Sequence, residues 1–269
     1  MTELELMLMS IGNCRRIDLY VDRRLLNGHK AGLLEEMLVR RKSGEPLQYI
    51  LGFSEFLGIR LRVDRRVFIP RPETELLVEA VLKEISITNG SLEILDIGTG
   101  SGNIAISLIK NIPDCRVTAI DISQDALGVA SQNARLNQIE DKIELIQSDL
   151  FLNLRKSRRE KAPFDIIVSN PPYIPTEEIA RLPLDVRQEP NIALDGGSEG
   201  MNFYRAIIQQ APQFLKEGGL IFLEIGDGQK EAIAGIFAEK DSFRIKECIK
   251  DYCGTERVLI AELKNRWIN

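Results

Sequence analysis

The pattern of apolar and polar positions divides the chain into three stretches of different character. Over residues 1–45, apolar residues recur every three to four positions, as at Leu33, Leu34 and Leu38, which predicts a helical segment. From Gln48 to Ile69 apolar and polar residues alternate, and this is typical of a β-hairpin or an extended linker. The rest of the chain switches repeatedly between strand-like and helix-like patterns.

That third stretch predicts a regular series of strands and helices. Strands are expected at 92–97, 116–120, 143–147, 164–169, 220–225, 243–248 and 257–262. Helices are expected at 73–85, 103–110, 123–137, 202–215 and 229–238. Strands that alternate with amphipathic helices form a mostly parallel sheet with helices on both faces. The sequence therefore predicts an α/β fold with a doubly wound, Rossmann-like sheet of seven strands.

The composition is that of a protein that buries a substantial core. Hydrophobic residues make up 44% of the chain and charged residues 28%, which excludes disorder over its whole length. No apolar run approaches the roughly 20 residues of a membrane-spanning helix. The first residues carry Glu3 and Glu5, where a signal peptide would be basic. We therefore expect a cytoplasmic protein without membrane contact.

The cysteines, the histidine and the charge exclude further classes. Four scattered cysteines and a single histidine, His29, predict neither a disulfide framework nor a metal site. A net charge of -5 disfavours tight binding along a nucleic-acid backbone. The charge is also uneven, because residues 1–68 hold 12 basic against 9 acidic residues and the remainder holds 23 against 31. This difference indicates two parts with separate tasks.

A glycine-rich turn follows the first predicted strand of the sheet. It comprises Asp96, Ile97, Gly98, Thr99, Gly100, Ser101 and Gly102. Glycines at alternate positions let a backbone bend sharply and approach a ligand closely. A dinucleotide-binding turn would carry glycine where Asn103 stands, and no Gly-Lys-Ser/Thr follows for a P-loop. The turn alone is thus a ligand site of another kind or a purely structural bend.

Two further strand ends carry candidate ligand-binding residues. Asp121 ends the second strand, and a carboxylate there can accept hydrogen bonds from both hydroxyls of a ribose. We therefore expect a nucleoside without a pyrophosphate; the alternative is a solvated carboxylate. Asp149 and Phe151 follow the third strand, where they can hydrogen-bond and stack on an adenine. Alternatively, Phe151 belongs to the hydrophobic core.

The fourth strand leads into a stiff turn, Asn170-Pro171-Pro172-Tyr173. Its two prolines have no backbone N–H, so carbonyl groups are left pointing outward as acceptors. A planar –NH2 group placed here can donate to the side-chain oxygen of Asn170 and to the carbonyl of Pro171, while Tyr173 stacks on its flat face. Such a pocket suits an amide or an exocyclic amine whose nitrogen must be aimed at an electrophile.

Together these motifs resemble those of the class I methyltransferases that use S-adenosylmethionine. The glycine turn, the acid that ends the second strand and the Asn-Pro-Pro-Tyr turn occur here in the order typical of that class. Further segments narrow the resemblance to the peptide chain release factor glutamine methyltransferases (the HemK/PrmC type). These segments are Pro46–Gly52, Phe68–Glu75, Gln188–Pro190 and Ala193–Gly197 with Gly200.

The resemblance implies an activity, a partner and a domain organisation. The activity is transfer of a methyl group from S-adenosylmethionine to the side-chain amide of the glutamine in the Gly-Gly-Gln motif of class 1 release factors, which supports translation termination. The product of the cofactor is S-adenosylhomocysteine. The implied domains are a helical substrate-docking domain over 1–52, a β-hairpin linker over 53–69 and a methyltransferase domain over 70–269. We expect a monomer that does not bind nucleic acid directly.

The resemblance also assigns residues to roles. The substrate glutamine would be held by Asn170, Pro171, Pro172 and Tyr173, of which Asn170, Pro171 and Tyr173 would be catalytic. The cofactor would be bound by Gly98, Thr99, Gly100, Ser101, Gly102, Asp121, Asp149, Phe151 and Asn170. The carboxylates Glu73, Glu75 and Glu189 stay open between a structural role and contact with the cofactor. The basic segment 155–161 is expected to be a solvated loop, with contact to RNA or to an acidic protein surface as the alternative.

Three other functions share parts of this pattern. Methyltransferases that act on adenine N6 of DNA or on guanine in RNA have similar Asn-Pro-Pro-Tyr chemistry, but they should show a strongly basic face and a recognition domain. A non-catalytic nucleoside-binding module would not require the intact turn at 170–173. A sister enzyme that methylates a glutamine of a ribosomal protein is set apart by the resemblance alone.

Overall fold

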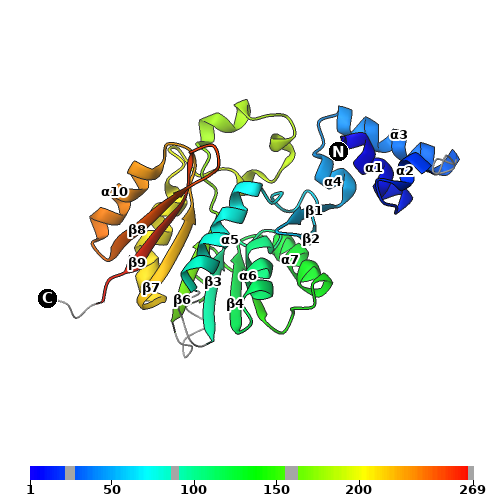
Figure 1. The fold of residues 1–269 in the computed structure, drawn as a ribbon. Coiled ribbons are helices and arrows are strands. Elements are labelled where there is room, and N and C mark those ends of the chain that lie inside the picture. The colour runs from blue at the N-terminus through cyan, green and yellow to red at the C-terminus, as the bar shows by residue number, and fades with distance from the viewer. Residues whose placement is uncertain (22–27, 86–90, 155–162, 266–269) are drawn as a thin grey trace.

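A seven-stranded sheet forms the centre of the protein in a computed structural model that describes residues 1–21, 28–85, 91–154 and 163–265. The strand order is β5-β4-β3-β6-β7-β9-β8 (Figure 1). The strands are β3 (Leu92–Ile97), β4 (Cys115–Asp121), β5 (Ile143–Gln147), β6 (Phe164–Ser169), β7 (Leu215–Glu224), β8 (Phe243–Lys250) and β9 (Glu256–Leu263). The predicted doubly wound fold is therefore confirmed.

The direction of the strands changes at one side of the sheet. Strands β3 to β7 are parallel neighbours, whereas β9 runs antiparallel between β7 and β8. Ile97 pairs with Ile120 on one side and with Ser169 on the other. The carboxyl ends of β3, β4 and β6 therefore lie together at one edge, where the chain order of the strands reverses, and ligands of open α/β sheets bind at such an edge.

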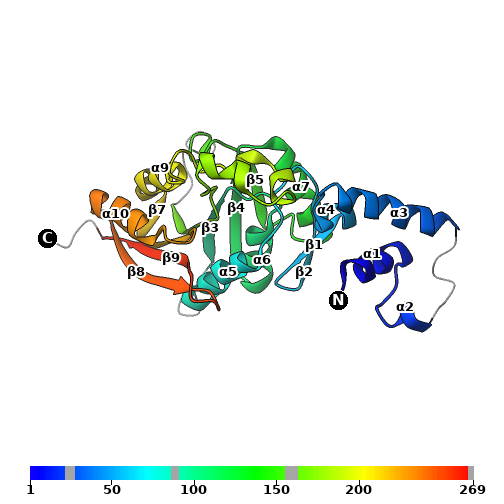
Figure 2. The ribbon, with the colours of Figure 1, turned by 90° about the horizontal axis from the view of Figure 1, so that it is seen from above.

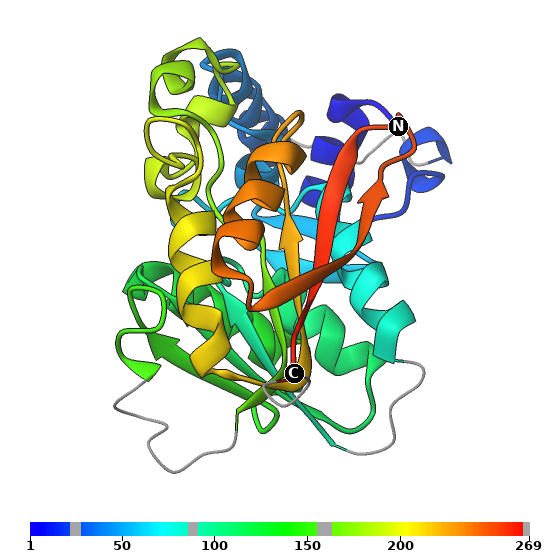
Figure 3. The same ribbon diagram turned by 90° about the vertical axis from the view of Figure 1, so that its left-hand side faces the viewer.

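Helices cover both faces of the sheet (Figures 2 and 3). Their bounds are α5 (Pro72–Ile85), α6 (Asn103–Asn111), α7 (Gln124–Leu136), α9 (Asn202–Gln210) and α10 (Lys230–Lys240). Apolar side chains of α5, α6 and α7 form one core with the sheet, and those of α9 and α10 form a second core on the opposite face. None of the helices in the described ranges is long and apolar enough to cross a membrane.

Short helices and a hairpin precede the sheet. They are α1 (Glu3–Gly12), α2 (Asp18–Val21), α3 (Gly28–Lys42), α4 (Leu47–Leu51), β1 (Phe53–Phe56) and β2 (Ile59–Arg62). The prediction that residues from Gln48 onward are extended was wrong for α4, which ends at the left-handed Gly52. Ion pairs join α3 to its neighbours, through Arg41 to Glu3 and through Arg40 to Glu45.

A buried asparagine connects the hairpin to the glycine turn. Asn133 on α7 accepts a hydrogen bond from the N–H of Arg62 at 2.7 Å and donates to the carbonyls of Arg62 and Ser101 at 3.0 and 2.9 Å. All three polar groups of this side chain are thus satisfied by backbone, so the asparagine fixes one element against the other.

A long connection between β6 and α9 folds over the carboxyl edge of the sheet. It contains three short 3-10 helices, at Thr176–Arg181, Val186–Gln188 and Asn191–Ala193. Glu189, which is 5% exposed, accepts from the N–H of Ile69 at 2.9 Å and pairs with Arg71. This carboxylate therefore attaches the connection to the segment that enters α5, which favours its structural role. The basic segment 155–161 lies in a range outside the described residues.

Candidate active site

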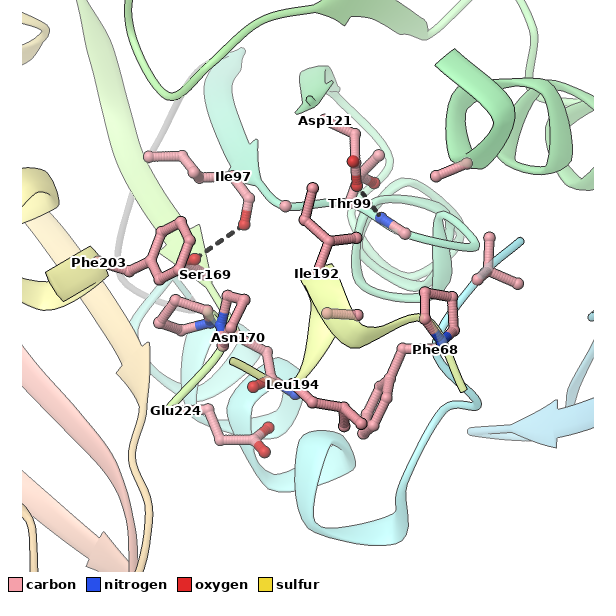
Figure 4. Close-up of a pocket in the computed structure, with 18 of the residues that line it drawn as sticks. Phe68, Ile97, Thr99, Asp121, Ser169, Asn170, Ile192, Leu194, Phe203 and Glu224 are labelled. Atoms are coloured by element: carbon pink, nitrogen blue, oxygen red, sulfur yellow. Dashed lines mark hydrogen bonds between the residues drawn. The ribbon is translucent and has the colours of Figure 1, made fainter. Parts of the chain in front are cut away.

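A cavity of about 510 Å³ opens at the carboxyl edge of the sheet (Figure 4). It is lined by residues 97–101 of the glycine turn, by residues that follow β4, β5 and β6, by the segment that enters α5, and by the connection from Val186 onward. Gly102, which was predicted to bind the cofactor, does not line the cavity and packs against Ile106 and Ala130 instead. This volume is in the range of pockets that hold small-molecule ligands. The single histidine, His29, is exposed on α3 and does not line the cavity.

The glycine turn adopts backbone angles that keep its cavity side open. The φ angles of Gly98 and Gly100 are 74° and 55°, and a Cβ added to either would meet nothing within 4 Å. The N–H groups of Gly98 and Thr99 both donate to the carbonyl of Ile120 at 2.9 Å. Thr99 also donates its hydroxyl to buried Asp96 at 2.7 Å. Hydrogen bonds to β4 and to Asp96 therefore hold the turn in place, and space remains beside Gly98 and Gly100.

Asp121 joins the glycine turn to the start of α7. One carboxylate oxygen accepts from the N–H of Gly100 at 2.9 Å, and the other accepts from the N–H of Ser123 at 2.9 Å. Burial raises the pKa of this carboxyl, and these backbone hydrogen bonds oppose that shift. Each oxygen of an ionised carboxyl retains a lone pair for a further donor. Asp121 lines the cavity and can offer those lone pairs to a diol.

The segment after β5 places Asp149 and Phe151 in different environments. Asp149 lines the cavity as expected, but Phe151 is fully buried and stacks on Phe214 with 4.6 Å between ring centroids. The physical reason is the left-handed conformation of Leu150, whose φ is 45°. This residue faces the cavity, while the chain reversal sends the next side chain into the core. Adenine stacking on Phe151 is therefore wrong, and Leu150 and Ile122 supply the apolar lining there.

The Asn-Pro-Pro-Tyr turn is fixed by side chains on three sides. Ser169 donates to the carbonyl of Ile97 at 2.8 Å, which ties the end of β6 to β3. Asn170 donates its side-chain N–H to the hydroxyl of Thr74 at 3.0 Å. Gln229 donates to the carbonyl of Tyr173 at 2.9 Å. Because the amide N–H of Asn170 faces α5, its side-chain oxygen is available to the cavity.

The glycine at position 196 lets the connection after β6 pack directly on the Asn-Pro-Pro-Tyr turn. A Cβ on Gly196 would lie 2.8 Å from the carbonyl oxygen of Pro172 and 2.8 Å from the Cα of Tyr173. The connection can therefore approach the turn this closely only with glycine at that position. Burial raises the pKa of the Tyr173 hydroxyl to about 12, so this tyrosine is neutral at physiological pH.

Glu224 is a residue of the cavity that was not predicted from the sequence. Glu224 ends β7, is 2% exposed and lines the cavity beside Asn170 (Figure 4). Burial raises its pKa to about 7, whereas Thr74 and Arg257 lower it. A signal did exist, because Glu224 ends an apolar strand in the same way that Asp96 and Asp121 end or nearly end theirs.

Comparisons with known proteins identify the family of this chain. The model of the methyltransferase small domain matches residues 72–182, and that of the PrmC N-terminal domain matches residues 1–52. A release factor glutamine methyltransferase of Thermodesulfovibrio yellowstonii is 42% identical over 92% of this chain and 87% of its own length. The chain belongs to the release factor glutamine methyltransferase family. The predicted family is thus confirmed.

A second relative supports the same assignment, and a solved structure shares the fold. A release factor glutamine methyltransferase of Lactococcus lactis subsp. lactis is 43% identical over 88% of this chain and 84% of its own length. The structure of a ribosomal protein L11 methylase from Lactobacillus delbrueckii subsp. bulgaricus has a TM-score of 0.54 and 25% identity, and the match covers 76% of this chain and 86% of that chain. The release factor glutamine methyltransferase family therefore shares its sheet with methyltransferases of other substrates.

Proposed function

We propose that this protein transfers a methyl group from S-adenosylmethionine to the side-chain amide nitrogen of the glutamine in the Gly-Gly-Gln motif of class 1 release factors. One observation carries this proposal: the glycine turn, Asp121 and the Asn-Pro-Pro-Tyr turn line a single cavity in a member of this family. S-adenosylhomocysteine and the methylated release factor are the products. The enzyme is thus a protein-(glutamine-N5) methyltransferase.

The cavity fits this cofactor in shape and in chemistry. The space beside Gly98 and Gly100, where an added Cβ would meet nothing within 4 Å, would receive the methionine part. The free lone pairs of Asp121 suit the two ribose hydroxyls. Asp149 would accept a hydrogen bond from the adenine amino group, and Leu150 and Ile122 would supply the apolar lining for the ring. When bound, the cofactor supplies a methyl group on a positively charged sulfur with a neutral leaving group.

The residues of the Asn-Pro-Pro-Tyr turn orient the substrate amide. An amide nitrogen is a weak nucleophile because its lone pair is delocalised, so alignment and charge stabilisation supply most of the catalysis. The side-chain oxygen of Asn170 and the carbonyl of Pro171 accept its two N–H bonds, and Tyr173 packs on its plane. Methyl transfer from the sulfur to this nitrogen would place positive charge on the amide, and the acceptors Asn170 and Pro171 would stabilise that charge through stronger hydrogen bonds. Release of one N–H proton to solvent would then give the neutral methylamide, with S-adenosylhomocysteine as the leaving group.

Residues 1–52 are the proposed docking domain for the release factor, and we infer that the enzyme acts as a cytoplasmic monomer without nucleic acid. The charge distribution supports this division, because the candidate cofactor- and substrate-binding residues all lie in the acidic part of the chain. The test is deletion of residues 1–45. The shortened protein should bind S-adenosylhomocysteine as before and fail to modify intact release factor. If the shortened protein still methylated intact release factor at the wild-type rate, residues 1–45 would not be needed for docking.

Mass spectrometry tests the reaction itself. The protein is incubated with S-adenosylmethionine and, separately, with a class 1 release factor, duplex DNA, ribosomal RNA and ribosomal protein. We expect a gain of one CH2 group on the release factor alone, at the Gly-Gly-Gln glutamine. A gain on nucleic acid would favour the alternative nucleobase methyltransferases, a gain on ribosomal protein would favour the sister enzyme, and no gain on any substrate would favour a binding module.

A further inference from the structure

A buried carboxyl group beside the Asn-Pro-Pro-Tyr turn has one oxygen without a hydrogen-bond partner among the described residues. Glu224 ends β7, and its Oε2 atom is buried and accepts no hydrogen bond within the described part of the chain. Figure 4 shows its carboxyl group directed toward the cavity near Asn170. A buried acidic group without a full set of partners is costly to maintain, so this position needs a reason.

The neighbours of Glu224 explain what the carboxylate controls. Asn170 donates its amide N–H to the hydroxyl oxygen of Thr74 at 3.0 Å, and Thr74 is 1% exposed on α5. The hydroxyl of Thr74 therefore keeps its own hydrogen for another acceptor. Glu224 is close enough for hydrogen bonds with both Thr74 and Asn170 to lower its pKa. A carboxylate is an acceptor only, so both neighbours must turn donors toward it.

This requirement fixes the orientation of one amide. With its –NH2 group held by Thr74 and Glu224, Asn170 has its oxygen directed to the cavity. If Asn170 rotated by half a turn, its oxygen would face the carboxylate and its –NH2 group would face the substrate. The substrate amide would then meet a donor where it needs an acceptor. The orientation of Asn170 thus decides whether the cavity presents an acceptor to the –NH2 group of a substrate amide.

We propose that Glu224 is a positioning residue whose carboxylate, together with Thr74, holds the Asn170 oxygen toward the cavity and so selects a primary amide as the methyl acceptor. This inference rests on the proposed function and adds a residue to it. It also gives a role to the carboxyl group at the end of β7, whereas the proposed cofactor-binding residues follow β3, β4, β5 and β6.

The mechanism makes activity depend on the ionisation of Glu224. Once protonated, the carboxyl group becomes a donor and no longer excludes the rotated Asn170. Burial raises its pKa to about 7, so activity should fall as the pH decreases through that value. The groups that face it are Glu73 and Thr74 on α5, Asn170 and Tyr173 after β6, Tyr204 on α9, and Arg257 on β9. Of these, Arg257 favours the ionised form and Glu73 opposes it.

Four variants test the inference in steady-state assays on release factor from about pH 5.5 to about pH 8.5. The glutamine in Glu224→Gln can donate as well as accept, so it no longer fixes the orientation of Asn170. We expect kcat to fall by about 3- to 10-fold, the value of one hydrogen bond. The decrease of kcat below about pH 7 should also disappear. Thr74→Val should lower kcat by a similar factor, and Thr74→Ser should restore it. KM for S-adenosylmethionine should not change in any of them. Glu79→Gln, an exposed position on the same helix as Thr74, is the matched control.

An NMR measurement on the protein without substrate separates this inference from the proposed function. The side-chain amide resonance of Asn170 should shift with pH around pH 7 in the wild-type protein and stay constant in Glu224→Gln. A constant resonance in the wild type, or a Glu224→Gln enzyme with the wild-type acidic limb and kcat, overturns the positioning role. Absence of any methylation of release factor by the wild type instead overturns the proposed function, and the resonance still decides the role of Glu224.

Discussion

Replacement of Asp121 by asparagine keeps the shape of the side chain and removes its charge. In the wild-type protein the two carboxylate oxygens accept from the N–H groups of Gly100 and Ser123, each at 2.9 Å. With a ribose bound, the same oxygens would accept from two hydroxyls as well. An asparagine has one oxygen and an –NH2 group, so one backbone N–H and one hydroxyl meet a donor instead of an acceptor.

The expected loss of cofactor affinity follows from these contacts. A hydrogen bond to a charged group contributes about 1.5–3 kcal/mol, and Asp121 is half-buried in the cavity wall, which reduces solvent screening. Asp121→Asn should therefore raise the Kd for S-adenosylhomocysteine by roughly 10- to 150-fold. Titration calorimetry measures this change. Asp125→Asn, an exposed acid in the first turn of α7, should leave the Kd unchanged.

A modified ligand separates the ribose contact from the support of the glycine turn. The wild-type protein should bind 2′-deoxy-S-adenosylhomocysteine more weakly than the full ligand, whereas Asp121→Asn should bind the two with nearly equal affinity. Such a difference measures the coupling between the carboxylate and the hydroxyl. Equal sensitivity of both proteins to the missing hydroxyl would show that Asp121 does not contact the ribose.

Three further changes test separate parts of the description. Asn170→Ala should reduce kcat for methyl transfer by about 10²-fold or more and leave the Kd for S-adenosylhomocysteine within a few-fold; unchanged turnover would remove Asn170 from catalysis. Phe151→Ala should lower the free energy of unfolding by about 3–5 kcal/mol without weakening cofactor binding, whereas a selective loss of binding would restore adenine stacking. Burial raises the pKa of Asp96 to about 7, so its protonated form favours the fold, and this stabilisation is lost as the pH rises from about 4 to about 7. Urea unfolding at pH 5 and pH 8 should show a smaller difference for Asp96→Asn than for the wild type, and an equal difference would refute the assignment.

The central strands could be predicted closely because they are buried on both faces. Such strands appear as short continuous apolar runs, and the predicted ranges 92–97 and 164–169 coincide with β3 and β6. The range 143–147 also coincides with β5, although that edge strand is only partly buried. Strand β7 begins at Leu215, five residues before the predicted start at Leu220. Its first half was missed because it contains charged residues and glycines, which interrupt the apolar pattern. Helix α4 is only five residues long, which is too short for a 3.6-residue period to appear.

The site was predictable where its function depends on local sequence, and not where it depends on tertiary packing. The glycine turn and the Asn-Pro-Pro-Tyr turn are continuous segments whose chemistry follows from their residue types. Whether Phe151 faced the ligand or the core depended on the left-handed backbone of Leu150, which no neighbouring residue indicated. The link between Glu224 and Asn170 joins residues 54 positions apart through Thr74 on a third element, so it required the fold.

The antiparallel position of β9 determines how the protein fails when its chain is shortened. Strand β7 lies between β6 and β9, and β8 reaches the sheet only through β9. A nonsense mutation before Glu256 would therefore leave the apolar segment Leu220–Leu223 on an open edge, and unpaired apolar edges recruit strands from other molecules. We expect such truncated chains to accumulate as aggregates, because β7 becomes an exposed edge strand when β9 is missing.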